Sequence, residues 1–84
     1  MLEKGAVIRS LAGRDKGCLL AVMQAEGRSV TVCDGKERPL NRPKSKNIRH
    51  IEPAGFALTE SELASDRALR RALRRIDSEL NGNT

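Results

Sequence analysis

The sequence predicts a mainly β protein, in which four to five short strands form a small, strongly bent barrel and one amphipathic helix follows. Two observations lead to this prediction. Short apolar runs in residues 6–51 alternate with turn signals about every eight to twelve residues, as in small barrels. From residue 59 onward, apolar residues recur at helical spacing instead. A chain of 84 residues forms one small unit with a thin core, which leaves no room for a deep substrate cleft.

The expected strands lie close together in the first two thirds of the chain, and Gly or Asp-Gly turns separate them. Pro39 has no N–H to donate to a neighbouring strand, so the segment around it can form only a short edge piece. Pro53 is expected to end the last strand. The predicted strands are residues 6–10, 18–24, 29–33, a piece within 36–40, and 46–51. Alternation along them places five side chains inside the barrel: Val7, Leu20, Val22, Val30 and Val32.

The C-terminal segment is expected to form one helix over residues 59–80, because it lacks Pro and opens with a capping box from Thr59 to Glu62. One face of this helix is apolar: Leu69, Ala72, Leu73, Ile76 and Leu80. The other face is basic: Arg67, Arg70, Arg71, Arg74 and Arg75. Acids balance these arginines, which favours a solvated face with i,i+4 pairs such as Asp66 with Arg70; an RNA-binding face is the alternative.

The chain therefore divides into a barrel, residues 1–53, and a linker with the helix, residues 54–84. All of the net charge of +5 belongs to the first part, since the second part has as many acids as bases. The excess is concentrated in residues 36–50, called the basic strap below, in which Glu37 is the one acid. Its six cations are Lys36, Arg38, Arg42, Lys44, Lys46 and Arg49. Such a surplus is typical of a surface that binds a polyanion.

A Gly-rich stretch, "SLAGRDKGC" at residues 10–18, lies between the first two predicted strands. A phosphate-binding loop requires four residues between its glycines and then Lys-Ser or Lys-Thr, whereas three residues separate Gly13 from Gly17 here. A tight turn that presents charges is therefore favoured. Asp15 is expected to hold the shape of this turn by accepting hydrogen bonds from backbone amides, and Gly35 is assigned to a second turn.

The remaining composition excludes several classes of protein. Cys18, Cys33 and a single histidine are too few for a four-ligand zinc site, so no metal or cofactor is expected, and the cysteines are expected to be small buried or half-buried residues. No signal peptide or membrane span is evident, which predicts a cytoplasmic protein. No nucleophile or second base accompanies His50, so an enzyme is not expected. Phe56 is the one aromatic residue, which favours structured RNA over single strands as a partner.

The order of residues in "KGAVIRSLAGRDKGCLLAV" resembles the KOW motif of ribosomal proteins and transcription elongation factors. The downstream "VCDGKERPLNRPKSKNIRHI" is similar to small bacterial KOW-domain RNA-binding proteins related to the large-subunit ribosomal protein L14e group. The resemblance covers about residues 3–52 and implies an SH3-like barrel. It places Gly13 and Gly17 in the turn and Arg14 and Lys16 at an RNA-facing tip. Further residues match its basic stretch: Lys44, Lys46 and Asn47, followed by His50.

Charge and resemblance together predict a non-catalytic RNA-binding protein, ribosomal or ribosome-associated, whose partners are ribosomal RNA and also ribosomal proteins. The alternative is a protein-interaction module in transcription or translation, because KOW barrels also bind proteins. His50 has an alternative as well, a structural or surface role. The apolar face of the helix is expected to pack on the barrel or on a second copy, which would form a dimer. The predicted RNA-binding residues are Arg14, Lys16, Lys36, Arg38, Arg42, Lys44, Lys46, Asn47, Arg49 and His50.

Overall fold

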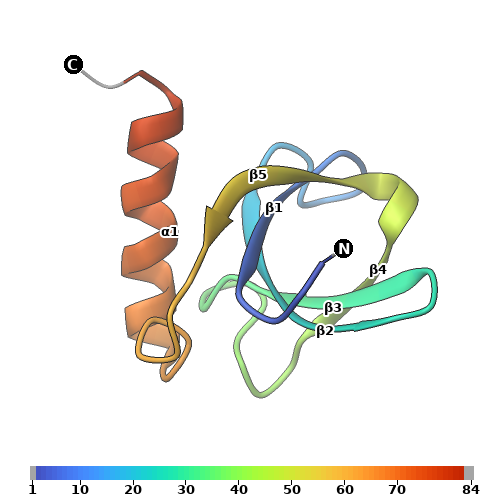
Figure 1. Cartoon of the computed structure of the whole chain (residues 1–84), viewed down its shortest axis with the longest axis horizontal. Coiled ribbons are helices and arrows are strands. Elements are labelled where there is room, and N and C mark those ends of the chain that lie inside the picture. Colours follow the sequence, from blue (N-terminus) through green and yellow to red (C-terminus); the bar gives the residue numbers. More distant parts are fainter. Residues whose placement is uncertain (1, 83–84) are drawn as a thin grey trace.

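A computed structural model describes residues 2–82 and confirms a mainly β fold with one C-terminal helix (Figure 1). Five antiparallel strands form one open, strongly bent sheet in the order β4-β3-β2-β1-β5. The strands are β1 (Ala6–Ser10), β2 (Leu19–Glu26), β3 (Ser29–Cys33), β4 (Lys44–Asn47) and β5 (Ile51–Ala57). A 3-10 turn, η1 (Ile48–His50), joins the last two strands, and α1 (Asp66–Leu80) follows β5.

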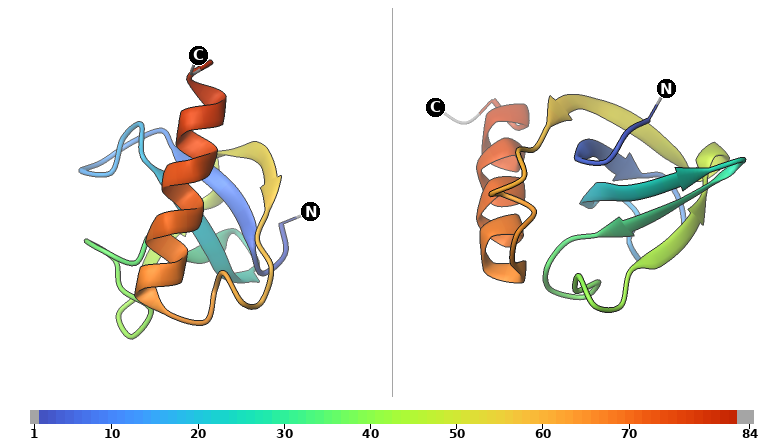
Figure 2. Two further views of the ribbon diagram at one scale, coloured as in Figure 1. Left: turned by 90° about the vertical axis from the view of Figure 1, so that its left-hand side faces the viewer. Right: turned by 60° about the horizontal axis from the view of Figure 1, so that its bottom comes forward.

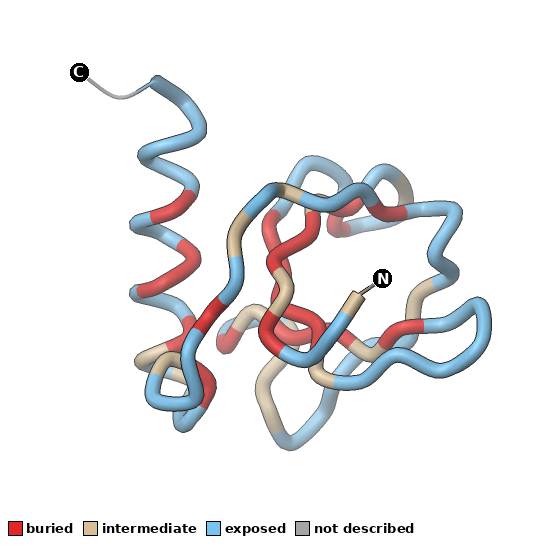
Figure 3. The backbone as a smooth tube through the Cα atoms, in the orientation of Figure 1, coloured by how far each residue is buried: buried red, intermediate tan, exposed pale blue. Residues whose placement is uncertain are grey.

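Two apolar clusters form the core, and the helix contributes to one of them. One fills the inside of the bent sheet and contains Ile8, Leu20, Val22, Val30, Val32 and Ile51. The other lies between the sheet and α1, which stands beside the sheet in Figure 2. In this cluster, Val7, Leu19 and Ala21 meet apolar residues of the helix. Buried positions recur along α1, whereas the hairpin ends are exposed (Figure 3). The helix therefore packs on the sheet of its own chain.

The prediction that Val7 points into the barrel is wrong, because its neighbour Ile8 fills that position. Both residues are fully buried, since β1 is covered on one side by the barrel interior and on the other by the helix. The other four predicted interior residues are in the interior cluster. Alternation identifies the two faces of a strand, but it cannot say which face a helix covers.

Three predicted strand boundaries are also wrong. Residues 36–40 contain no strand, and the neighbour of β3 is formed by Lys44–Asn47 instead. The expected strand 46–51 is interrupted by η1. Beyond η1, β5 continues through Pro53 to Ala57, because β5 is an edge strand, where a missing N–H is tolerated.

The helix begins at Asp66 rather than at residue 59. Ser65 is its N-cap and accepts a hydrogen bond from the Ala68 N–H at 3.1 Å. The predicted capping box does form, but it closes a separate turn before α1, in which the Glu62 carboxylate accepts from the Thr59 N–H at 2.9 Å. That hydrogen bond, together with the nearby Arg75, lowers the pKa of Glu62 below its ordinary value. Two caps compete in this segment, and the second one starts the helix.

Candidate nucleic-acid interface

The Gly loop, residues 11–18, connects β1 to β2 and returns the chain through a tight turn. Gly13 and Gly17 have φ angles of 80° and 87°, in the left-handed region that favours glycine. The turn is closed at its base by the Gly17 N–H, which donates to the Ser10 carbonyl at 2.8 Å. Arg14 and Lys16 are exposed on this loop. The glycines thus allow a turn that presents two cations to solvent.

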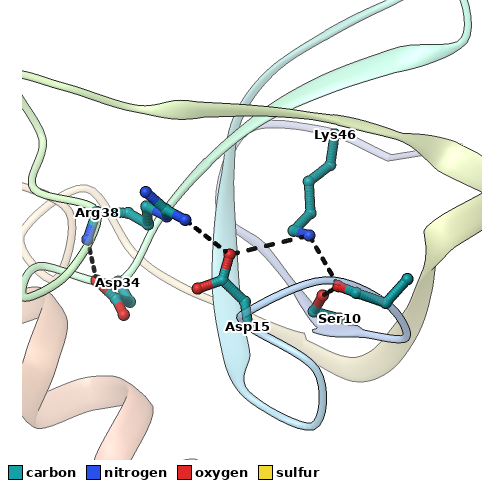
Figure 4. A network of polar contacts seen from close by, with 6 residues as sticks. Ser10, Asp15, Asp34, Arg38 and Lys46 are labelled. Carbon is teal, nitrogen blue, oxygen red and sulfur yellow. Dashed lines mark hydrogen bonds and ion pairs between the residues drawn. The ribbon is translucent and has the colours of Figure 1, made fainter.

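Asp15, between these two cations, is buried and joins the Gly loop to the basic strap. Its Oδ2 accepts from the Arg38 guanidinium at 3.4 Å and lies 3.9 Å from the Lys46 ammonium, which also donates to the Ala12 carbonyl at 3.2 Å. The two cations approach the carboxylate from opposite sides (Figure 4). Asp15 therefore holds two segments together through side-chain cations, and not through backbone amides as the sequence suggested.

Arg38 is itself fixed in place by its own turn. The Asp34 carboxylate accepts from the N–H groups of Lys36 and Arg38, both at 2.8 Å. Figure 4 shows the bond to Arg38. Arg38 Nε is buried and has no hydrogen-bond partner among residues 2–82. One donor of this guanidinium is therefore directed at Asp15 while another stays unused, and an unused buried donor is costly.

A hollow of about 340 Å³ opens between the Gly loop, β4 and η1, and is called the barrel hollow below. Six of the ten predicted RNA-binding residues line it: Arg14, Arg38, Lys44, Lys46, Asn47 and His50. Asp15 is the one carboxylate among the described residues that line it. Two separate segments of the sequence therefore converge on one basic depression.

The six lining residues are not equally available to a ligand. Lys44 and Arg14 are exposed, whereas the Lys46 side chain is only 8% exposed and directed at Asp15 and Ala12. The Asn47 side chain caps η1 by accepting from the Arg49 N–H at 2.8 Å. Lys46 and Asn47 thus have structural roles that the sequence did not indicate.

The other four predicted residues are exposed outside the barrel hollow: Lys16, Lys36, Arg42 and Arg49. The strap is not extended throughout, because the Arg42 N–H donates to the Pro39 carbonyl at 2.9 Å and the chain turns there. Ala12 and Ser45 line the hollow but were not predicted. Neither residue is charged, so the only feature of the sequence that could have pointed to them is their position next to predicted residues.

The two cysteines differ in environment, and both are free thiols. Burial, followed by the charges of Asp66 and Asp34, raises the pKa of the Cys33 thiol to about 11. Cys18 is exposed, contrary to the prediction that both are at least half-buried. In residues 2–82, His, Cys, Asp and Glu side chains form no group of three or more that could bind a metal ion.

No protein-family model matches this chain, and no curated protein matches it either. The similarity to KOW-domain proteins therefore depends on the quoted motifs alone. Within the described part of the chain, no helix is long and apolar enough to cross a membrane. The fold and the barrel hollow together define a small β-barrel-like protein with a basic depression at one edge of its sheet.

Proposed function

We propose that this protein binds structured RNA without catalysing a reaction, and that the barrel hollow contacts the phosphate backbone. Ribosomal RNA is the proposed partner, in a ribosomal or ribosome-associated role. The observation that carries the proposal is the convergence of cations from the Gly loop and the strap around one hollow whose single carboxylate is already paired. Phosphates are the polyanionic groups that such a surface fits, because they accept from guanidinium and ammonium donors.

Arg14 and Lys44 are the phosphate contacts that the geometry supports best, because both are exposed at the rim of the hollow. Arg38 and Lys46 shape the floor and raise the local positive potential. His50 also lines the hollow, where an imidazole can donate to a phosphate or pack on a base. No Phe, Tyr or Trp lines the hollow, which favours recognition of backbone and shape over single-strand stacking.

A salt titration tests this proposal. The affinity for a ribosomal RNA fragment, measured by fluorescence anisotropy, should fall steeply with salt, and each phosphate contact should contribute about 0.7–0.9 to the slope of log affinity against log salt. The double variant Arg14→Gln, Lys44→Gln should lower that slope by about 1.4–1.8 and weaken binding by about 15- to 30-fold at physiological salt. Circular dichroism should show that its fold is unchanged, since both side chains are exposed.

The matched control is Lys4→Gln, Arg28→Gln, which removes the same charge from exposed positions outside the hollow. If the control weakens binding as much as the hollow variant, only the net charge matters and the proposed site is wrong. A separate experiment tests the ribosomal part of the proposal. When a lysate is sedimented at low and at high salt, the protein should travel with ribosomal particles at low salt.

One observation favours the second candidate, a protein-interaction module. Leu11 and Ile48 are large apolar side chains, 42% and 41% exposed, in the Gly loop and η1 beside the hollow. The Leu11 N–H donates to the His50 carbonyl at 2.8 Å, which keeps these two segments together. Binding through such apolar residues would be only weakly salt-dependent, so the same titration separates the two candidates.

A further inference from the structure

The outward face of α1 carries a row of arginines that the barrel hollow does not include. Arg67, Arg71 and Arg74 are spaced four and three residues apart and are exposed, opposite the face that packs on the sheet. From the first to the last they extend over about 10 Å of helix, roughly one Debye length at 0.1 M salt, so their potentials add. They are called the arginine row below.

The zero net charge of residues 54–84 conceals this row, because three of the five acids, Glu62, Asp66 and Glu79, are bound elsewhere. Among residues 2–82, Arg75 is the one helix arginine with an ion pair, to Glu62 at 3.1 Å and Glu79 at 4.0 Å. The predicted pair between Asp66 and Arg70 does not form.

The two partners of that expected pair bond instead to backbone groups of the strap and of the residue that precedes it. The Asp66 carboxylate accepts from the Leu40 N–H at 2.7 Å, and Arg70 donates to the Gly35 carbonyl at 2.8 Å. These contacts remove a carboxylate from the helix surface and leave the arginine row without a neutralising partner in the described chain. The helix surface is therefore basic, although its segment is neutral.

Two further hollows connect the barrel hollow to the helix. The first lies between the Gly loop and the start of the strap, measures about 350 Å³, and shares Arg14, Asp15 and Arg38 with the barrel hollow. The second, about 340 Å³, lies between these loops and α1 and shares Cys18 and Asp34 with the first. Its helix side is lined by Arg70, Leu73, Arg74 and Asp77. Because neighbouring hollows share lining residues, the three hollows follow one another from β4 to the arginine row, and together they are called the furrow below.

Charge is distributed unevenly along this furrow. Cations outnumber carboxylates at its two ends: four line the barrel hollow against Asp15 alone, and Lys36, Arg70 and Arg74 line the helix end against Asp34 and Asp77. In the middle hollow, the carboxylates of Asp15, Asp34 and Glu37 outnumber the cations of Arg14 and Arg38. A single strand of phosphates along the floor would be repelled at the centre. Two rows of phosphates separated by a groove would contact the cationic ends only, and the central carboxylates would face the groove.

We propose that the furrow and the arginine row bind one double-stranded segment of RNA, with the barrel end on one phosphate row and α1 on the other. This inference deepens the proposed RNA-binding function and depends on it. The shallow minor groove of an A-form helix displays 2′-hydroxyl groups, which can donate to carboxylates such as the exposed Glu37. Duplex RNA is therefore the partner that this order of charges fits, and duplex DNA lacks the groups that its centre would recognise.

The test uses the full chain with two RNAs, a duplex as long as the 37 Å length of the protein and one strand of that duplex alone. Arg71→Gln, Arg74→Gln should weaken binding to the duplex by about 15- to 30-fold at physiological salt and lower the salt slope by about 1.4–1.8. Binding to the single strand, which has one phosphate row and can occupy the barrel end alone, should change little. The control Lys4→Gln, Arg28→Gln should affect neither RNA by more than a small factor. Glutamine is a good helix former, so α1 should be retained.

The outcomes separate this inference from the function on which it depends. If the helix variant binds both RNAs as the control does, while Arg14→Gln, Lys44→Gln is impaired, the helix has no part in binding and the inference is wrong. Wild-type protein that shows no salt-dependent RNA binding would refute the proposed function itself. Equal affinity for duplex DNA of the same sequence, or for poly-glutamate, would overturn the assignment of duplex RNA as the partner.

Discussion

Replacing Asp15 by Asn should lower stability and raise RNA affinity together. The carboxylate lies within 3.4 Å of the Arg38 guanidinium and 3.9 Å of the Lys46 ammonium, and it is almost fully buried. Asn has the same shape but no charge, so both cations lose their counter-ion without a large change in packing. The two effects have opposite signs because the same carboxylate joins the Gly loop to the strap and occupies cations that could bind phosphates.

The expected loss of stability follows from the geometry of the cluster. At these two distances, each pair is worth about 4–5 kcal/mol of Coulomb attraction with an effective dielectric constant of about 20. Most of that attraction is offset by the cost of removing the charges from water. A net loss of about 1–3 kcal/mol is expected for a hydrogen-bonded charge whose partners stay behind. In a chain of 84 residues, this corresponds to a drop in Tm of roughly 4–20 °C.

The expected gain in RNA affinity follows from counterion release. If one of the two released cations contacts a phosphate, binding should strengthen by about four- to sixfold at physiological salt, and the salt slope should steepen by about 0.7–0.9. Urea denaturation followed by circular dichroism measures the first effect, and anisotropy titrations at several salt concentrations measure the second. Both are performed at a temperature where the variant is folded.

Glu52→Gln is the matched control, because Glu52 is exposed on β5 and has no ion pair in the described part of the chain. It removes the same charge and should change stability by less than about 0.5 kcal/mol. If Asp15→Asn is as stable as this control, the cluster does not join the two segments. If its RNA affinity falls along with its stability, Arg38 and Lys46 need Asp15 to be positioned for binding, and the reasoning that they are withheld from phosphates is refuted.

Three further predictions concern the fold. Gly17→Ala should lower the free energy of unfolding by about 1–2 kcal/mol through the positive φ alone. Gly35→Ala should lower it further, because the new Cβ would also press on the first turn of α1. Equal losses in urea denaturation would contradict the close packing of the helix. Ellman's reagent should label Cys18 in the native protein and Cys33 only after unfolding, and rapid labelling of both would contradict the burial of Cys33. Because the pKa of Glu62 is lowered, its contribution to stability is complete above the ordinary value of 4.5 and is lost as the pH falls below it. Thermal melts should therefore show Glu62→Gln less stable than wild type at neutral pH and equal to it in acid. A difference that persists in acid would refute the assignment.

Local sequence patterns predicted the type of the elements, because neighbouring residues determine it. Short apolar runs between turn signals indicated β1 and β2, period-two alternation indicated β3, and helical spacing indicated α1. The boundaries of the elements depended on which of two competing signals acts in the folded chain, and the sequence does not rank these signals. Ser65 prevailed over Thr59 as the start of the helix, and Pro53 did not end β5 because that strand is at an edge. Edge position is a property of strand order, which no single strand encodes.

The location of the basic surface was predictable, but the state of each cation was not. Counting charges identified the strap, and six of the ten predicted residues meet at one hollow. The count could not show that Lys46 points inward, because its partners, Asp15 and the Ala12 carbonyl, are about thirty residues earlier in the chain. A cation in a basic run is available to a ligand only when tertiary structure leaves it unpaired. The sequence does not show which residues of two separate loops lie opposite each other.

Counting charges also misled for α1, but in the opposite direction, because there it concealed a basic surface. Equal numbers of acids and bases in residues 54–84 made a neutral, solvated face the simpler interpretation. Folding separates these charges, because Asp66 bonds to the strap and Glu62 to Arg75, while Arg67 and Arg71 stay on the outer surface. Net charge is a sum over a segment, whereas an approaching polyanion responds to the potential at one face, which decays within about a Debye length. A neutral helix can therefore present a basic face, and binding measurements with α1 intact are the ones that can detect it.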